Sequence, residues 1–226
     1  GDELLAPSSV NVDGQAISFY PKNDTLNWRN TYYWDRQQMR YHHGDYSKAV
    51  VYNWLAINNT ITGVLGSMKQ PEEGRVWYNY WNVDTNGDLI PHTNRHSPGQ
   101  IKSPAKIVRA VEDETGNIDW SMAQREYDPL YGNLTKTIDP LGRELVYEYN
   151  PTGTVPGAVT GIDLTAIKVK NGGAYETLTT FTNYINGLPQ TITHASGTVQ
   201  TLQYNAKGQL VEQTTSKGAD SETTRF

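Results

Sequence analysis

Apolar and polar side chains alternate in short runs along most of the chain. In the run at 144–149, Tyr147 and Tyr149 fall on one face of an extended segment, and Glu144 and Glu148 fall on the other. Such alternation predicts β-strands with one face in contact with water. No segment has a convincing helical periodicity, and 121–124 is expected to form one short helical turn at most. The pattern predicts an all-β fold, an antiparallel repeat sheet of consecutive β-hairpins with little or no helix.

Glycine recurs at a nearly fixed interval between these runs. The steps are 10 and 11 residues in one block and 10, 11 and 10 in a second, counted over Gly132, Gly142, Gly153 and then Gly187, Gly197, Gly208, Gly218. A strand of about six residues and a turn of about four fill one such step. One hairpin cannot bury its own face, so successive hairpins are expected to pack side by side.

The rest of the chain divides into segments of the same kind. Residues 1–14 are expected to be a loosely held terminus and 91–104 a loop, while 61–68 are left open between helix and strand. Strands are expected at 15–20, 49–57, 74–83 and 105–111, and hairpins are expected between 31–34 and 38–42 and, around Asn171-Gly172-Gly173, between 165–170 and 175–182.

These segments predict two regions. Residues 1–74 form an N-terminal β-hairpin region, interpreted as divergent repeats. Residues 75–226 form a repeat sheet, with clear repeats at 124–153 and 180–218 and a truncation at the C-terminal end. The chain starts at Gly1 and stops inside a further unit, so we expect it to be a piece of a longer protein.

Composition and charge narrow the function classes. Lys and Arg total 19 and Asp and Glu total 24, which gives a net charge of −5 without a block of basic residues, so nucleic acid is not an expected partner. No apolar run is long enough to predict a membrane span. With Cys 0, disulfides and thiolate metal sites are excluded.

One stretch has the oxygen spacing of a calcium loop. Asp84, Asn86 and Asp88 alternate as calcium ligands do, but Leu89 stands where the sharp turn needs glycine, and Arg95 stands where the loop needs its final carboxylate. An Asn-Gly turn with flanking carboxylates is therefore the favoured interpretation.

The remaining candidates for chemistry are also weak. His92 and His96 are four residues apart, which suits a metal on a helix, but Pro91 and Pro98 indicate a loop. The serine of 63–67 is misplaced for a nucleophile elbow. We expect no catalytic residue, no metal and no cofactor.

The aromatic stretch at 77–81 has two interpretations. Trp77 and Trp81 share one face of the expected strand with Asn79, whereas Tyr78 and Tyr80 share the other. The favoured interpretation is cross-strand packing. The alternative is an exposed platform on which sugar rings stack, and because one pair is expected to be core, at most half of the cluster is available to such a ligand.

The repeat units resemble a known family. Tyr127-Asp128 followed by Gly132, then Asp139-Pro140-Leu141-Gly142-Arg143, then Tyr147-Glu148-Tyr149-Asn150, resembles the RHS or YD repeat of bacterial Rhs proteins, toxin-complex C components and teneurins. The similarity is strong over 124–153, good over 180–218, and extends over most of 60–226. The positions that define the repeat are Tyr127, Asp128, Gly132, Asp139, Gly142, Tyr147, Tyr149, Gly153, Tyr184, Gly187, Gly197, Tyr204 and Gly208.

The resemblance implies a function as well as a fold. In this family many hairpins coil into a spiralling sheet that forms a hollow shell, and in bacterial toxins the shell holds a C-terminal toxic domain. It implies a non-catalytic structural module, secreted or at the bacterial cell surface, whose partners are the adjacent repeats and the C-terminal domain of the longer protein. The alternative is a cell-surface or carbohydrate-binding adhesion module. Open sheet edges also predict weak dimers.

Overall fold

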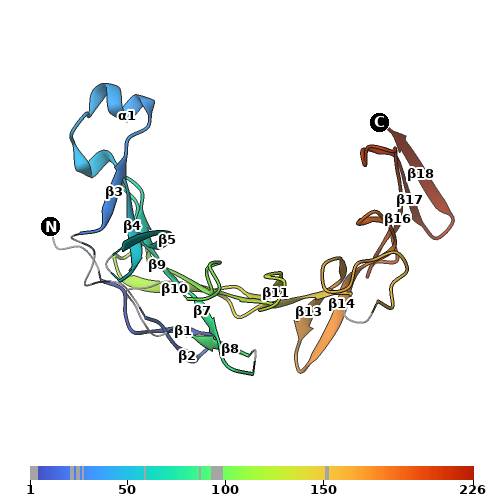
Figure 1. Cartoon of the computed structure of the whole chain (residues 1–226), viewed down its shortest axis with the longest axis horizontal. Helices are drawn as coiled ribbons and strands as arrows, with labels where there is room; N and C mark the ends of the chain where they lie inside the picture. The colour runs from blue at the N-terminus through green and yellow to red at the C-terminus, as the bar shows by residue number, and fades with distance from the viewer. Residues whose placement is uncertain are drawn as a thin grey trace. The chain divides into compact units, whose positions relative to one another are not determined.

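The computed structural model of the chain describes residues 5–20, 23, 26, 28–58, 60–86, 88–92, 99–150 and 153–226. Over these residues the protein consists of β-strands with a short α-helix and a 3₁₀ turn (Figure 1). The predicted all-β fold is therefore confirmed. The chain divides into two compact units: unit 1 comprises Gly1–Pro129 and Ile138–Gly142, and unit 2 comprises Leu130–Thr137 and Arg143–Phe226. The boundary predicted at 74–75 stays a prediction.

The elements up to β10 are β1 (Ser9–Val12), β2 (Gln15–Ser18), β3 (Asn30–Tyr33), α1 (Arg36–Tyr41), η2 (Tyr46–Lys48), β4 (Val50–Ile57), β5 (Thr60–Lys69), β6 (Arg75–Asn79), β7 (Trp81–Val83), β8 (Leu89–Pro91), β9 (Lys106–Glu112) and β10 (Ile118–Tyr127). The later elements are β11 (Leu134–Ile138), β12 (Glu144–Tyr149), β13 (Leu164–Asn171), β14 (Ala174–Ile185), β15 (Leu188–His194), β16 (Val199–Tyr204), β17 (Leu210–Lys217) and β18 (Asp220–Arg225).

Nearly every strand of the main sheet is hydrogen-bonded to the next strand in the sequence. Among the described residues this sheet has fourteen strands, in the order β18-β17-β16-β15-β14-β13-β12-β11-β10-β9-β6-β5-β4-β3. The one step that skips strands is β6 to β9, since β7 and β8 pair with each other in a separate two-stranded sheet. Short turns favour this arrangement because they can join only antiparallel neighbours.

The predicted hairpin around Asn171 is confirmed. β13 and β14 are antiparallel, and Asn171 lies opposite Ala174, so Gly172 and Gly173 alone form the connection. Gly172 has a φ of +59°, which a two-residue hairpin loop requires. The strands predicted at 49–57 and 105–111 are present as β4 and β9, and the ambiguous 61–68 lie within β5.

The predicted strand at 38–42 is wrong, because α1 spans Arg36–Tyr41. The Asp35 carboxylate accepts a 2.8 Å hydrogen bond from the backbone N–H of Gln38, which caps the helix. The following side chains are long and unbranched, as helices favour. The helical turn suggested for 121–124 is also wrong, since these residues lie in the middle of β10 and pair with β9.

The N-terminal hairpin β1–β2 covers one face of the sheet in unit 1. Residues 9–12 are a strand and not a loose terminus, because Val10 and Val12 are only 3% and 5% exposed. The buried cluster combines side chains of residues 6–19 with side chains of the sheet: Ala6, Val10, Val12 and Phe19 with Trp77, Val108 and Met122.

Polar contacts hold this N-terminal segment in place. The amide of Asn79 accepts from the backbone N–H of Tyr20 and donates to its carbonyl, both at 2.7 Å. Lys106 donates to the carbonyl of Ser18 at 2.7 Å. The segment is therefore tied to the sheet, because side chains of the sheet form hydrogen bonds with its backbone groups.

Unit 2 has a different construction, with few fully buried side chains. Every residue of β11 and of β15 is partly exposed, on both faces of the strand. A strand that covers a globular core buries one face and exposes the other. These strands therefore belong to a single layer whose two faces both retain access to water.

The loop after β12 folds back onto its own strands. Asn150 is fully buried, its side chain donates to the carbonyl of Ala158 at 2.8 Å, and its own carbonyl accepts from Gly161 at 2.7 Å. The carbonyl of Pro156 accepts from the backbone N–H of Tyr184 at 3.0 Å. This loop is thus held by buried polar contacts rather than by an apolar core.

Candidate functional site

Three of the repeat-defining glycines, Gly142, Gly197 and Gly208, lie in turns with the same backbone hydrogen bond. In one turn the side chain of Asp139 accepts from the N–H of Leu141, and the N–H of Gly142 donates to the carbonyl of Asp139 at 3.0 Å. In another, Asn205 and Gly208 make the same backbone contact at 2.9 Å. Both glycines have a φ of +77°, which a side chain would oppose. Turns with a glycine at positive φ therefore recur at this interval, and the turn at Gly187 differs in being a two-residue hairpin loop.

A related turn outside the clear repeats shows how many hydrogen bonds the first side chain of such a turn can accept. Asp113 accepts hydrogen bonds from the side chain and backbone of Thr115 and from the backbone of Asn117, at 2.7–2.9 Å. These bonds lower the pKa of Asp113 to about 2, with the hydroxyl of Thr115 as the largest cause. A carboxylate at this position thus accepts the backbone donors of the turn.

Tyrosine hydroxyl groups connect the end of one strand to the start of its neighbour. Tyr149 donates to the carbonyl of Leu134 at 3.0 Å, and Tyr204 donates to that of Pro189 at 3.3 Å, each 15 residues earlier. Tyr184 donates to the carbonyl of Leu164. We call these three contacts the tyrosine latches. Unit 1 has two similar hydrogen bonds: the Tyr80 hydroxyl donates to the carbonyl of Leu65 at 2.5 Å, and the Tyr127 hydroxyl donates to the carbonyl of Pro104 at 3.2 Å.

Burial raises the pKa values of the latch hydroxyls above their ordinary value. It raises the pKa of Tyr184 to about 12, and it also raises the pKa values of Tyr149, Tyr204 and Tyr80. Desolvation is the largest cause in each case. The sequence predicted these tyrosines as packing residues, and their role as hydrogen-bond donors was missed. The spacing of 15 residues, which the contacts of Tyr149, Tyr204 and Tyr80 share, was the signal that could have revealed it.

Removing one latch hydroxyl tests this role. Tyr184→Phe is expected to lower the free energy of unfolding of unit 2 by about 1 kcal/mol, since the Leu164 carbonyl loses its side-chain donor. Urea denaturation followed by far-UV circular dichroism measures the change. The matched control is Tyr147→Phe, because Tyr147 is a half-buried tyrosine of β12 that is not one of the latches. Equal effects of the two substitutions would contradict the latch.

A buried carboxylate joins four strands of unit 2. Glu144 on β12 accepts from Tyr175 on β14 and from Lys170 on β13 at 3.4 Å, and lies 3.9 Å from Lys136 on β11. Burial opposes ionisation, but the hydrogen bond from Tyr175 and the two lysines lower the pKa of Glu144 overall. The charge is therefore compensated within the sheet.

The aromatic stretch at 77–81 does not form one surface. Trp77 is 0% exposed and Tyr80 is 4% exposed, whereas Tyr78 and Trp81 are half-buried. The expected alternation fails because β6 ends at Asn79 and Trp81 belongs to β7 in another sheet. Trp77 has no face to offer a sugar ring.

The calcium-loop candidate at Asp84 is explained by a turn. Asp84 accepts from the backbone of Asn86 at 2.8 Å and of Asp88 at 2.9 Å, which is the favoured turn. His96 lies outside the described residues. Over the part of the chain that is described, no three His, Asp or Glu side chains converge as metal ligands would.

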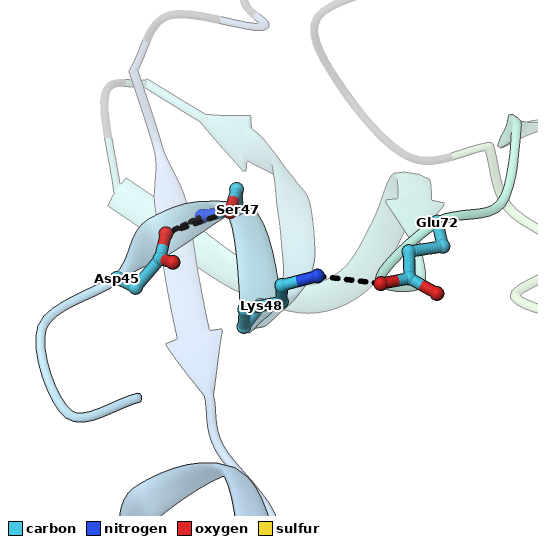
Figure 2. Close-up of polar contacts among 4 residues, drawn as sticks. All are labelled: Asp45, Ser47, Lys48 and Glu72. Atoms are coloured by element: carbon cyan, nitrogen blue, oxygen red, sulfur yellow. Dashed lines mark hydrogen bonds and ion pairs between the residues drawn. The ribbon is translucent and has the colours of Figure 1, made fainter. Parts of the chain in front are cut away.

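A polar groove of about 580 Å³ lies in unit 1 beside η2. Its walls come from β3, η2, β4, β5 and the turn before β6, and its lining includes Asn30, Tyr32, Tyr46, Lys48, Lys69, Glu72, Glu73 and Arg75. Figure 2 shows the ion pair between Lys48 and Glu72, 2.5 Å apart, which bridges two of these walls. Arg75 is buried and donates to the hydroxyl of Ser67 at 3.0 Å. The sequence analysis missed this groove because its residues are dispersed over 26–75.

Local hydrogen bonds shape the wall that carries Tyr46. Asp45 accepts from the backbone of Ser47 at 3.0 Å and from its hydroxyl at 2.7 Å, and these bonds lower the pKa of Asp45 (Figure 2). The indole of Trp34 donates to the carbonyl of Asp45 at 3.0 Å. The ion pair raises the pKa of Lys48 and lowers that of Glu72, chiefly through their hydrogen bond.

None of the described helices is both long and apolar enough to cross a membrane.

Comparisons with known proteins give a match over part of the chain. The family described as RHS Repeat matches residues 186–220. No curated protein matches the chain. Among solved structures, the chain is similar to TcdB2-TccC3, with 14% identity and a TM-score of 0.45 over 79% of this chain and 10% of that one.

Two further solved structures are similar to the same extent. TcdB2-TccC3 without its hypervariable C-terminal region has 13% identity and a TM-score of 0.46 over 80% of this chain and 10% of that one. The Photorhabdus luminescens Tc holotoxin pore has 12% identity and a TM-score of 0.44 over 79% and 10%. The chain spans about a tenth of the length of these structures. The family match confirms the resemblance drawn from the sequence over residues 186–220, which are similar to the RHS repeat.

Proposed function

We propose that the chain is a non-catalytic wall segment of a larger RHS-type, toxin-like protein, whose shell encloses or presents a C-terminal effector. The observation that carries the proposal is the single-layer sheet of unit 2, in which each strand from β12 to β17 pairs with its successor. Strands such as β11 and β15 bury neither face fully. Such a layer separates two aqueous spaces, whereas a globular domain would bury one face.

The tyrosine latches and the Glu144 contacts support the same function. Both join neighbouring strands through polar bonds, so they hold the layer together without a thick apolar core. The sheet order ends in β18 on one side and β3 on the other, and strand edges of this kind accept further strands. The adjacent repeats of the longer protein are the proposed partners, and weak dimers of the isolated chain stay a prediction.

The proposal includes a location and the absence of catalysis. We place the protein in a bacterial secreted or cell-surface setting, as its RHS repeat implies. The isolated chain is expected to show no turnover on panels of glycosides, esters and peptides. Turnover that a single substitution abolishes would contradict the non-catalytic assignment.

Limited proteolysis of the longer polypeptide tests enclosure. The region beyond residue 226 is expected to resist protease in the intact protein and to be cleaved when produced alone. Combining Tyr149→Phe, Tyr184→Phe and Tyr204→Phe is expected to increase its cleavage, because the wall loses all three latches. Tyr147→Phe is the control. Equal cleavage of the region in the intact protein and in isolation would contradict enclosure.

A further inference from the structure

The connection between β3 and β4 departs from the short turns that join most strands of the main sheet. It consists of residues 34–49 and contains α1 and η2. Figure 1 shows α1 beyond the end of β3, clear of the strands of unit 1. None of the six residues of α1 is buried. Long connections of this kind carry function more often than short turns do, so the surface chemistry of this one indicates its partner.

Hydrogen bonds within the connection fix its shape. The indole N–H of Trp34 donates to the carbonyl of Asp45 at 3.0 Å, which joins the two ends of the connection. The Asp35 carboxylate accepts from the backbone N–H of Gln38 at 2.8 Å. The Asp45 carboxylate accepts from the backbone N–H of Ser47 at 3.0 Å. A surface that is ordered before binding loses little conformational entropy in a complex.

Two arginines of α1 have no carboxylate partner within the described part of the chain. Arg36 and Arg40 are exposed and lie one helical turn apart, so their side chains are neighbours. The acidic residues of the connection, Asp35 and Asp45, accept backbone hydrogen bonds instead. The whole chain has a net charge of −5, so the positive charge of the two arginines is a local feature.

Exposed apolar and aromatic side chains accompany the arginines. Met39 is 45% exposed, Tyr41 is 64% exposed, and Tyr33 at the end of β3 is 57% exposed. Met39 follows Arg36 by three residues, so the two side chains share one side of the helix. The guanidinium of Arg40 lies 5.3 Å from the ring centroid of Tyr41. We call these five residues, Tyr33, Arg36, Met39, Arg40 and Tyr41, the arginine–tyrosine tip.

The chemistry of the tip fits an anionic lipid surface. A guanidinium binds phosphate oxygens through two N–H groups at once. Tyrosine rings are favoured at the boundary between a bilayer and water, because the ring is apolar and the hydroxyl is polar. We propose that the arginine–tyrosine tip binds the surface of a bilayer that contains acidic phospholipids. The two arginines contact lipid phosphates, while Met39 and Tyr41 lie among the headgroups.

A second polyanion, single-stranded nucleic acid, fits the tip less well. Proteins that bind it use a positively charged groove that follows its backbone. The tip is a projecting helix, and the polar groove of unit 1 has the carboxylates of Glu72 and Glu73 in its lining. A bilayer surface requires no such groove. The lipid site goes beyond the wall function and does not depend on it.

Cosedimentation of the chain with lipid vesicles tests the proposal. The probes are vesicles of phosphatidylcholine alone and vesicles in which part of this lipid is replaced with phosphatidylserine. The chain is expected to sediment with the second kind only, and less at high salt, because salt screens the attraction between charges. Combining Arg36→Gln with Arg40→Gln is expected to lower the partition coefficient by about thirtyfold, the effect of two cationic side chains at an anionic surface. Tyr41→Ala is expected to lower it as well.

The matched control removes two positive charges from unit 2. Lys207 and Lys217 are both exposed, and combining Lys207→Gln with Lys217→Gln changes the net charge of the chain by the same amount. This variant is expected to keep the partition coefficient of the unsubstituted chain. Circular dichroism verifies that each variant is folded, and glutamine in place of arginine preserves helix propensity in α1.

Four outcomes would overturn the proposal. The first is the absence of sedimentation with the phosphatidylserine vesicles, and the second is equal sedimentation with both kinds of vesicle. The third is an equal loss of binding in the arginine and lysine variants. The fourth is binding to a single-stranded oligonucleotide that is as strong as binding to the vesicles and needs the same arginines. The protease experiment has a separate readout, so the lipid site and the wall function are tested independently.

Discussion

Trp77→Ala is expected to lower the free energy of unfolding of unit 1 by about 3–5 kcal/mol. Trp77 is fully buried between the N-terminal segment and the sheet, where Phe19 and Met122 belong to the same cluster. Its ring lies 5.6 Å from that of Trp120 in an edge-to-face contact. Removing the indole leaves a large cavity that the surrounding strands cannot fill. Amide hydrogen exchange in β6, β9 and β10 measures the loss locally.

The matched control for this prediction is Trp28→Ala. Trp28 is 57% exposed and contacts the guanidinium of Arg29 at 5.1 Å, so its loss is expected to change stability by less than about 0.5 kcal/mol. Trp77→Phe is expected to cost less than Trp77→Ala because the Trp77 N–H has no acceptor among the described residues. Similar effects of Trp77→Ala and Trp28→Ala would contradict the packing described for unit 1.

Gly157→Ala is expected to destabilise unit 2 by about 3 kcal/mol or more. Gly157 has a φ of +74°, and a Cβ there would lie 1.8 Å from the carbonyl oxygen of Tyr184. That atom belongs to the backbone, so the loop after β12 must shift and give up the bond between Pro156 and Tyr184. Thermal and urea denaturation followed by circular dichroism measure the loss.

Gly197→Ala measures the cost of the backbone conformation without the steric clash that Gly157→Ala introduces. Gly197 has a similar φ of +79°, but a Cβ there meets nothing within 4 Å. Its substitution is therefore expected to cost about 1–2 kcal/mol, the cost of a left-handed backbone alone. If Gly157→Ala lowers the free energy of unfolding no more than Gly197→Ala does, the loop after β12 can move at little cost and the prediction is wrong.

Features set by local chemistry were predicted well. The connection at Asn171-Gly172-Gly173 and the turns at Gly142 and Gly208 depend on residues within a few positions of one another. For the same reason the alternation at 144–149 was sufficient to place β12. The helix α1 was missed although its signal is local, because the cap by Asp35 was overlooked in favour of a hairpin interpretation.

Features set by distant contacts were not predictable in the same way. The break between β6 and β7 was missed because the aromatic pattern continues through Tyr80 and Trp81 while the backbone changes sheets. The groove was missed because its two walls, with Tyr46 and Glu72, meet only when β4 and β5 pair.

The sequence by itself determined the architecture: glycine turns at steps of 10 and 11 residues, short alternating strands between them, and pairing of each strand with its neighbour. Only the tertiary structure decided which aromatic rings are buried and which are exposed. The reason is that alternating apolar and polar residues indicate only that a strand has two different faces. Whether a face is buried depends on which other segment packs against it. Trp77 is covered by the N-terminal segment that contains β1 and β2, whereas Tyr32 and Tyr46 line an open groove.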